Sequence, residues 1–245
     1  MNLFLNLLLL LFFSCSSSYN SEIWLNELDI NKTAYNEDLI NRKDGYHSIY
    51  GFEVQDSSFG IVMVHGSYPK NWDKKGYEWV EPLNVLSKNN VSMWFYKYNW
   101  NGCSNDIADS LKKHSIDLIE KNNHLDSLWF VGHSFGGLIS TILSEKWERD
   151  LPISVHSIAA PLKDINNSDD LCQDQERDDY NILQNVKYTQ WKTIQSEDGA
   201  FKHLNYDPQM IKINNGKIIT LPPDWKENRL GHNRSIIFVA EQLTR

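Results

Sequence analysis

The segment 127–143 constrains the fold more than any other part of the chain. It begins with SLWFV (127–131), a short apolar run typical of a strand buried on both faces. GHSFGG (132–137) follows at once, and then apolar residues recur at helical spacing, namely Leu138, Ile139, Ile142 and Leu143. A strand that passes into a helix through a glycine-rich turn predicts a strand–helix unit with Ser134 at the sharpest point.

The same alternation of buried strands and amphipathic helices continues along the chain. It predicts an α/β fold, with a doubly wound, mostly parallel sheet and helices on both faces. A chain of 245 residues that is 41% hydrophobic has room for one such domain with a sizeable core. The expected strands are 46–55 (at an edge), 60–64, 91–96, 127–131, 153–159, 187–193 and 217–221, and the other expected helices are 79–86, 105–121 and 235–243.

Ser134 is the candidate nucleophile, because it occupies the centre of a GxSxG pattern in this context. Such a turn displays the hydroxyl above the strand ends, beside the free N–H groups and positive dipole end of the following helix. The pattern alone also fits an ordinary glycine-rich turn with a capping serine. The buried strand before it and the additional Gly137 favour the catalytic interpretation. His133 points elsewhere on such a turn and is expected to pack.

On these residues the sequence resembles the α/β-hydrolase superfamily, from about Gly60 to the C-terminus. His65-Gly66-Ser67 supports the resemblance, because it follows the strand-like run GIVMV (60–64). In the family, an HG loop at this place supplies one N–H of the oxyanion hole. The resemblance implies the N–H of Ser67, with Tyr68 as the alternative, and assigns the second N–H to Phe135.

The base and the acid follow from the chain order of the family, which is Ser, acid, His. Three histidines remain as candidate bases. His156 lies inside an expected strand, and His203 lies close behind the candidate acid. His232 lies in a loop just before the last helix, where the family carries its catalytic histidine, and it is the favoured base.

The resemblance favours Asp198 as the acid, because the family often carries an Asp-Gly pair after this strand, and Asp198-Gly199 follows the expected strand 187–193. Glu197 and Asp207 are the alternatives. A serine needs an adjacent base that a third group holds in place, and Asp198 would hold the His232 tautomer without becoming protonated itself.

Residues 1–18 are expected to be a signal peptide, because 3–13 is nearly all Leu and Phe yet too short to span a bilayer with ease. Ser14 and Cys15 follow, an arrangement that resembles a bacterial lipoprotein signal. The resemblance implies lipidation of Cys15, a lipid anchor and a place in the cell envelope, as a periplasmic or outer-membrane lipoprotein. Ordinary secretion is the alternative. Residues 19–45 are expected to be a polar tether and lead-in, and 46–245 the hydrolase domain.

Residues 164–185 are polar and acidic and are expected to form a small lid-like insertion. This composition disfavours the apolar lid of an interfacial lipase and favours a soluble or moderately sized ester. A calcium loop is disfavoured, because Asp169 stands where the loop needs glycine. Cys103 and Cys172 either pair or stay free.

The sequence therefore predicts an exported serine hydrolase that cleaves a small-molecule carboxylic ester through an acyl-Ser134 intermediate. Amide or thioester hydrolysis or acyl transfer on the same triad is the second hypothesis, and a non-catalytic lipoprotein binding module on the same fold is the third. We expect no cofactor and no metal. With a net charge of −8 and no basic stripe, we expect no nucleic-acid partner.

Overall fold

The computed structural model describes residues 22–28, 39–68, 77–163, 172 and 177–244. The expected signal peptide with Cys15 lies outside these residues, and so does 164–171 of the expected insertion with its disfavoured calcium loop. Within the described ranges, every helix is too short or too polar to cross a bilayer.

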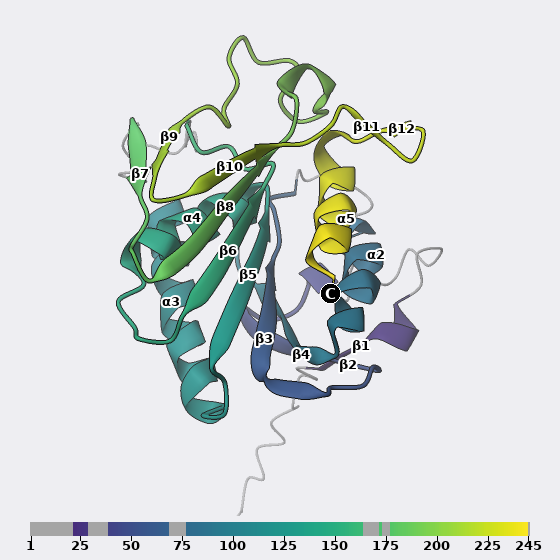
Figure 1. The fold of residues 1–245 in the computed structure, drawn as a ribbon, viewed down its shortest axis with the longest axis vertical. Coiled ribbons are helices and arrows are strands. Elements are labelled where there is room, and N and C mark those ends of the chain that lie inside the picture. Colours follow the sequence, from purple (N-terminus) through teal and green to yellow (C-terminus); the bar gives the residue numbers. More distant parts are fainter. Residues whose placement is uncertain (1–21, 29–38, 69–76, 164–171, 173–176, 245) are drawn as a thin grey trace, which may run out of the picture.

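An eight-stranded sheet of order β1-β2-β4-β3-β5-β6-β8-β10 forms the centre of the molecule (Figure 1). All neighbours from β4 to β10 are parallel, whereas β2 runs antiparallel to β4. The mostly parallel sheet predicted from the sequence is confirmed. The strands are β1 (Glu22–Trp24), β2 (Gly45–Tyr50), β3 (Asp56–Val64), β4 (Val91–Lys97), β5 (Ser127–His133), β6 (Ile153–Ile158), β8 (Val186–Lys192) and β10 (Lys217–Thr220).

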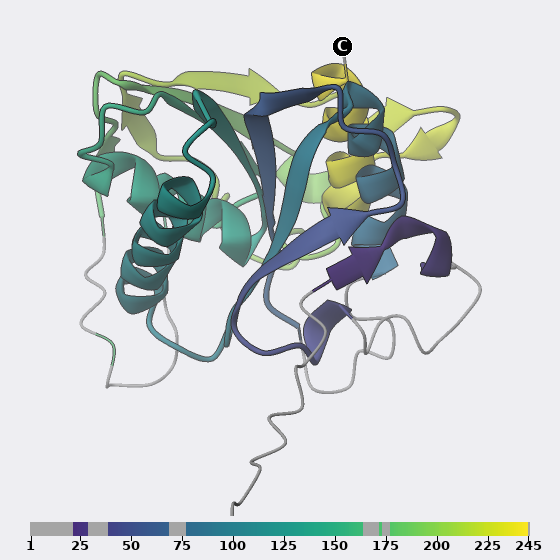
Figure 2. The same ribbon diagram turned by 90° about the horizontal axis from the view of Figure 1, so that it is seen from below.

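Helices cover both faces of this sheet. The helices α3 (Ser104–Lys121) and α4 (Phe135–Lys146) pack on one face, and α2 (Tyr77–Leu86) and α5 (Gly231–Leu243) pack on the other (Figures 1 and 2). Strand β3 shows why its run is continuously apolar. Val62 and Val64 belong to the core under α3 and α4, while Ile61 and Met63 belong to the core under α2 and α5.

The N-terminal side of the sheet differs from the prediction. The expected edge strand 46–55 is β2, and it lies between β4 and β1 instead of at the edge. The outer strand β1 comes from the segment 19–45, which was expected to be a tether, and Ile23 in it is 1% exposed. A strand of three residues is too short to show alternation in the sequence.

The described end of the expected insertion also packs on the domain. Its strand β7 (Asp179–Asn181) pairs with β9 (Lys212–Asn214), and Tyr180 and Ile182 are buried in the core, so this part is not an excursion over the sheet. Cys172 forms a disulfide with Cys103 just before α3, with 5.4 Å between the two Cα atoms. The open question of two free thiols or a pair is thereby answered.

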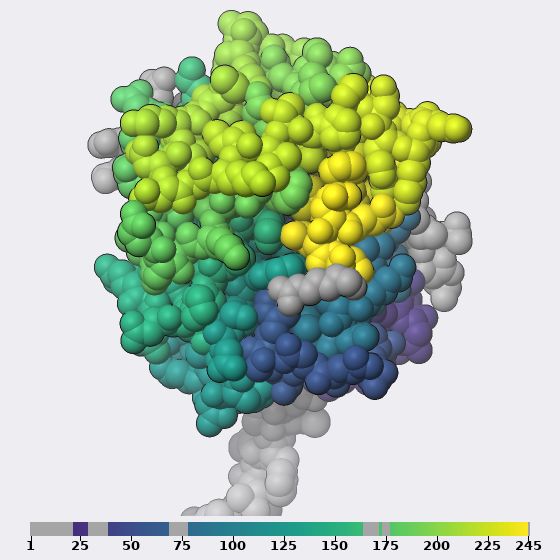
Figure 3. Space-filling model, viewed as in Figure 1, coloured from purple at the N-terminus to yellow at the C-terminus, as the bar shows by residue number. Residues whose placement is uncertain are grey.

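The segment between β8 and α5 gathers at one end of the molecule, in light green and yellow-green above the yellow helix in the space-filling view (Figure 3). It holds the short hairpin β11 (Asp224–Trp225) and β12 (Asn228–Arg229) as well as β9. The remaining short elements are the 3-10 helices η1 (Leu25–Glu27), η2 (Ser87–Asn89) and η3 (Gln195–Glu197).

Candidate active site

Ser134 lies between β5 and α4 in a strained backbone conformation, with φ 53° and ψ −122°. A non-glycine residue in such a conformation costs on the order of 1–3 kcal/mol and persists only where its surroundings hold it. Here the Ser134 N–H donates to Ile158 O at 2.8 Å, and its carbonyl accepts from the Gly137 N–H at 2.9 Å. The sharp turn expected at Ser134 is therefore present, and it is fastened to β6 and to α4.

The loop after β3 lies directly against this turn. A Cβ atom added to Gly66 would lie 3.1 Å from the Ser134 Cβ, so any larger residue would press the two segments apart by a few tenths of an ångström. His65 is fully buried, donates through Nδ1 to Gly66 O at 2.6 Å and accepts from the Tyr98 N–H at Nε2, 3.3 Å away. Burial lowers the pKa of His65 to about 3, so the ring is neutral and holds the loop.

Ser67 lines the same pocket as Ser134, and Phe135 opens α4 directly after it. The neutral His65 orients the loop that carries Ser67. Oxyanion donors act when they already face the developing charge, and both backbone N–H groups stay the predicted pair for that role.

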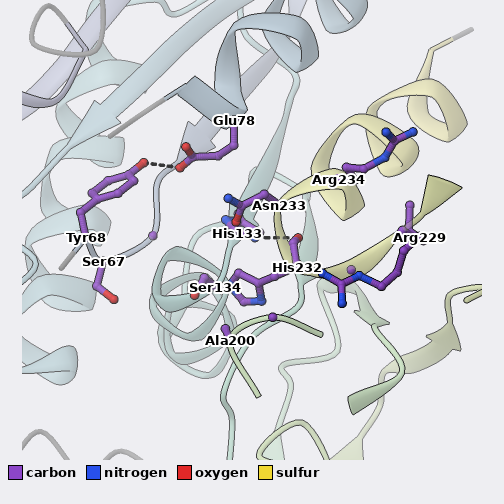
Figure 4. Close-up of a pocket in the computed structure, with 14 residues that line it drawn as sticks. Ser67, Tyr68, Glu78, His133, Ser134, Ala200, Arg229, His232, Asn233 and Arg234 are labelled. Carbon is purple, nitrogen blue, oxygen red and sulfur yellow. Dashed lines mark hydrogen bonds between the residues drawn. The ribbon is translucent and has the colours of Figure 1, made fainter. Parts of the chain in front are cut away.

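His232 and Asp198, which lie far apart in the sequence, meet beside this turn. The His232 Nδ1–H donates to Asp198 Oδ2 at 3.0 Å, and the His232 ring points toward Ser134 (Figure 4). His232 lies in the first turn of α5, whereas the sequence placed it in a loop before the helix. Asp198 directly follows η3, at the end of the loop that leaves β8.

Asp198 is fully buried and is held by two further hydrogen bonds. Thr193 donates from Oγ1 to Asp198 Oδ2 at 2.5 Å, and the Ala200 N–H donates to Oδ1 at 2.8 Å. Burial alone would raise the pKa of this carboxyl, but the hydrogen bond and charge of His232, helped by Thr193 and Ala200, bring it below its ordinary value. The carboxylate is therefore ionised at neutral pH and orients the imidazole.

Two residues that the sequence did not suggest complete this support. Gln209 is buried, accepts the Thr193 N–H at Oε1 (2.9 Å) and donates from Nε2 to Thr193 O at 3.1 Å, so it holds the residue that holds Asp198. Neither Thr193 nor Gln209 belongs to a motif, and only their contacts in the folded chain identify them.

His133 packs beside the site, as expected, and it also makes a specific contact. Its Nε2–H donates to the carbonyl oxygen of His232 at 3.2 Å, and its ring centre lies 4.6 Å from that of His232. Burial lowers the pKa of His133 well below its ordinary value, and the nearby His232 acts in the same direction. A neutral His133 can donate to His232 without adding charge to the pocket.

The alternative bases and acids lie elsewhere. His203 is exposed, and His156 on β6 accepts the Trp191 indole N–H at 3.3 Å. Asp207 pairs with Lys192 at 3.2 Å, and in the described part of the chain the carboxylate that binds the His232 ring is that of Asp198 and not that of Glu197. Of the candidates, Asp198 and His232 are the pair that the structure joins.

Ser134 and His232 share a pocket of about 470 Å³ (Figure 4), which lies in the size range of small-molecule sites, about 300–1,000 Å³. Its other lining residues come from three regions: the loop after β3 and α2 (Gly66, Ser67, Tyr68, Glu78), the neighbourhood of Asp198 (Gly199, Ala200) and the stretch from β12 into α5 (Arg229, Leu230, Gly231, Asn233, Arg234), with His133 at the turn. Across the described ranges, the His, Cys, Asp and Glu side chains form no group of three or more that could hold a metal ion.

No family model and no curated protein matches the sequence. Among solved structures, the chain is similar to a lipase-esterase related protein from Clostridium acetobutylicum ATCC 824, with a TM-score of 0.50 and 13% identity over 81% of this chain and 96% of that chain. The chain has the α/β-hydrolase fold. Est1E from Butyrivibrio proteoclasticus aligns with a TM-score of 0.49 and 14% identity over 79% of this chain and 87% of that chain. XC6422 from Xanthomonas campestris, a member of the α/β serine hydrolases, aligns with a TM-score of 0.46 and 13% identity over 76% and 79% of the two chains.

In the α/β-hydrolase fold, a ligand site belongs at the carboxyl ends of the parallel strands. Here β5 ends one residue before Ser134, β3 ends directly before the His65–Ser67 loop, and β8 leads to Asp198. The three predicted site segments therefore reach the same edge of the sheet because parallel strands end there together.

Proposed function

We propose that this chain is a serine hydrolase that cleaves carboxylic esters through an acyl-Ser134 intermediate, with His232 as general base and Asp198 as the acid that orients it. One observation carries the proposal. The strained Ser134 shares a pocket with a histidine whose far nitrogen is hydrogen-bonded to a buried, ionised aspartate. A nucleophile that shares a pocket with a base, together with a carboxylate that orients the base, suits acyl transfer.

In the first half of the reaction, Ser134 Oγ attacks the ester carbonyl carbon while its proton moves to His232 Nε2. The tetrahedral intermediate collapses, the carbon–oxygen bond to the alcohol breaks, and His232 returns the proton to the departing alcohol. In the second half, His232 takes a proton from water, the hydroxide attacks the acyl carbon, and Ser134 regains the proton as the acid leaves. The Ser67 and Phe135 N–H groups would stabilise the negatively charged oxygen in both halves.

A fluorophosphonate probe tests this proposal directly, because it reacts with an activated serine. We expect labelling of the wild-type protein, no labelling of Ser134→Ala, and a loss of ester turnover in His232→Ala by several orders of magnitude. The matched control is His203→Ala, which removes an exposed histidine that was the alternative base. An adduct that persists in Ser134→Ala, or equal losses in the two histidine variants, would contradict the assignment.

We also propose that the protein is exported and anchored through a lipid on Cys15. The Cys103–Cys172 disulfide supports export, because structural disulfides persist in oxidising compartments. Metabolic labelling with palmitate in a bacterial host should mark the wild-type protein and not Cys15→Ser. Label that survives in Cys15→Ser would rule out lipidation at this residue and leave ordinary secretion.

A further inference from the structure

The walls of the pocket carry opposite charges. Glu78 of α2 lies on one side, where its carboxylate accepts the Tyr68 hydroxyl at 2.6 Å. Arg229 and Arg234 lie on the other side, next to His232 (Figure 4). Arg229 extends its guanidinium toward His232, whereas Arg234 turns away from the pocket (Figure 4).

Arg234 is already committed to the structure. It donates to Trp225 O at 3.3 Å, and its guanidinium lies 5.4 Å from the centre of the Trp225 ring. The Arg229 side chain has no hydrogen bond, ion pair or ring contact within the part of the chain that the structure describes, and its backbone pairs with Asp224 across the hairpin. It is therefore the cation of this wall that remains available to a ligand.

The Arg229 side chain is exposed, but the hairpin that carries it has a defined shape. Arg229 ends the hairpin β11–β12, whose two turn residues, Lys226 and Glu227, have φ values of 49° and 60°. Such a two-residue turn favours Asn-Gly, and other side chains are strained in it. The strain shows that the surrounding contacts hold the hairpin in this shape.

Trp225 supplies those contacts. The Trp225 ring stands edge-on to Phe238 of α5, with 5.8 Å between the ring centres. Lys226 Nζ lies 4.2 Å from the centre of the Trp225 ring. Arg229 in turn folds back toward the pocket, since its Nε lies 3.7 Å from where a Cβ of Gly231 would be. The guanidinium thus lies beside the start of α5, on the side of His232.

An arginine in this place is chemically suited to a planar anion. Its guanidinium offers a fork of N–H donors that fits both oxygens of a carboxylate. The first turn of α5 holds no acidic residue that would neutralise this charge. The protein as a whole carries a net charge of −8, so an anionic substrate gains little from the general field and depends on a local cation.

We propose that Arg229 determines specificity, and that the pocket takes esters bearing a carboxylate at the Arg229 wall, away from Glu78. The proposal rests on the esterase function proposed above. The carboxylate can belong to the acyl chain or to the alcohol, and the chemistry of recognition is the same for both.

Two matched pairs of substrates separate these sources. Mono-4-nitrophenyl adipate against 4-nitrophenyl hexanoate places the charge on the acyl chain. In the second pair, 4-(hexanoyloxy)benzoic acid is compared with methyl 4-(hexanoyloxy)benzoate, and the charge lies on the leaving group. In at least one pair we expect the ratio of kcat/KM, anionic over neutral, to fall about threefold to fivefold in Arg229→Gln, the size expected for losing one exposed ionic contact.

Arg149→Gln is the matched control, because it removes the same charge from a residue that pairs with Glu120 at 3.6 Å and does not line the pocket. It should leave both ratios unchanged. A second measurement compares the salt dependence of the wild type with that of Arg229→Gln: raising the salt concentration should lower the wild-type ratio relative to that of the variant, because both proteins carry nearly the same negative net charge. Unchanged ratios in Arg229→Gln, or the same salt dependence in the wild type and in Arg229→Gln, would overturn the role of Arg229.

Ser134→Ala separates this inference from the proposed function. If turnover depends on Ser134 but both kcat/KM ratios are the same in the wild type and in Arg229→Gln, only the specificity proposal fails. If the wild type turns over none of the four esters, or Ser134→Ala keeps its activity, the esterase function fails first.

Discussion

Asp198 Oδ2 receives two hydrogen bonds, one from His232 and one from the Thr193 hydroxyl. The second bond keeps the carboxylate charged and aimed at His232, although Thr193 itself is buried and does not line the pocket. Thr193 is therefore a positioning residue, and its effect should appear in the chemical step and not in substrate binding.

We expect Thr193→Val to lower kcat about tenfold with little change in KM, because a hydrogen bond to a charged group contributes about 1.5–3 kcal/mol and part of it supports the orientation of His232. Steady-state kinetics with a 4-nitrophenyl ester measures this split. Thr193→Ser keeps the hydroxyl and should retain most of kcat. Equal losses in the two variants, or a change confined to KM, would show that the hydroxyl does not act through Asp198.

At the level of the elements, the approach of α4 to the end of β3 sets the shape of the site. A Cβ on Gly136 would lie 2.2 Å from Val64 O and 2.3 Å from His65 O, which are backbone atoms that cannot turn aside. Gly136→Ala should therefore lower the free energy of unfolding by about 3 kcal/mol and displace Ser134 from the His65–Ser67 loop.

Urea unfolding and fluorophosphonate labelling of Gly136→Ala measure the two effects. The matched control for stability is Gly199→Ala, since a Cβ on Gly199 would meet nothing within 4 Å. Its free energy of unfolding should stay within about 0.5 kcal/mol of the wild type. Similar losses in both variants would mean that the close packing of α4 on β3 does not limit the fold.

The Cys103–Cys172 disulfide ties the start of α3 to a residue 69 positions further along the chain. Closing a loop of that length removes entropy from the unfolded chain equivalent to about 4 kcal/mol. The double variant Cys103→Ser/Cys172→Ser should lose stability of this order in urea, and so should the wild type after reduction. A thiol assay on denatured protein that finds both cysteines free would contradict the pairing.

The sequence predicted the long elements well because apolar residues recur along each of them at a regular spacing. The buried runs that became β3, β4, β5 and β6 were identified to within a few residues, and so were α2 and α3. Strands of two or three residues, such as β1, β7 and β11, were missed because so few positions contain no period. Helix α5 was expected to begin at Ser235, but it begins at Gly231, because its first turn is polar and exposes no apolar repeat.

The candidate site divides in the same way. Ser134, Asp198 and His232 could be named from motif, chain order and neighbouring strands, and the structure places Asp198 against His232 as expected. Thr193, Gln209 and Arg229 could not be named, since hydrogen bonds in the folded chain identify Thr193 and Gln209, and its place in the pocket wall identifies Arg229. Local patterns thus indicate the proposed reacting groups, whereas the residues that support them depend on the tertiary fold.

At the scale of the whole molecule, burial keeps three histidines neutral, and this lowers the free energy of unfolding as the pH falls. Burial lowers the pKa of His65 to about 3 and of His156 to about 4, and it holds the pKa of His133 well below its ordinary value. In the unfolded chain each titrates near about 6.5. As the pH falls below that value, the unfolded chain binds protons that the folded protein does not, so the free energy of unfolding decreases until the folded pKa is reached.

Between pH 7 and 5.5 each of these histidines should remove about 1.2 kcal/mol of stability. His156 gives the cleanest test, because it lies away from the pocket and its Trp191 contact can be kept by an amide oxygen. In urea unfolding at the two pH values, we expect His156→Gln to lose about 1.2 kcal/mol less than the wild type. The comparison cancels the opposite effect of a shrinking negative net charge, which both proteins share.

His203→Gln, which replaces an exposed histidine, should lose as much as the wild type. If His156→Gln also lost as much, burial of His156 would not be coupled to its protonation.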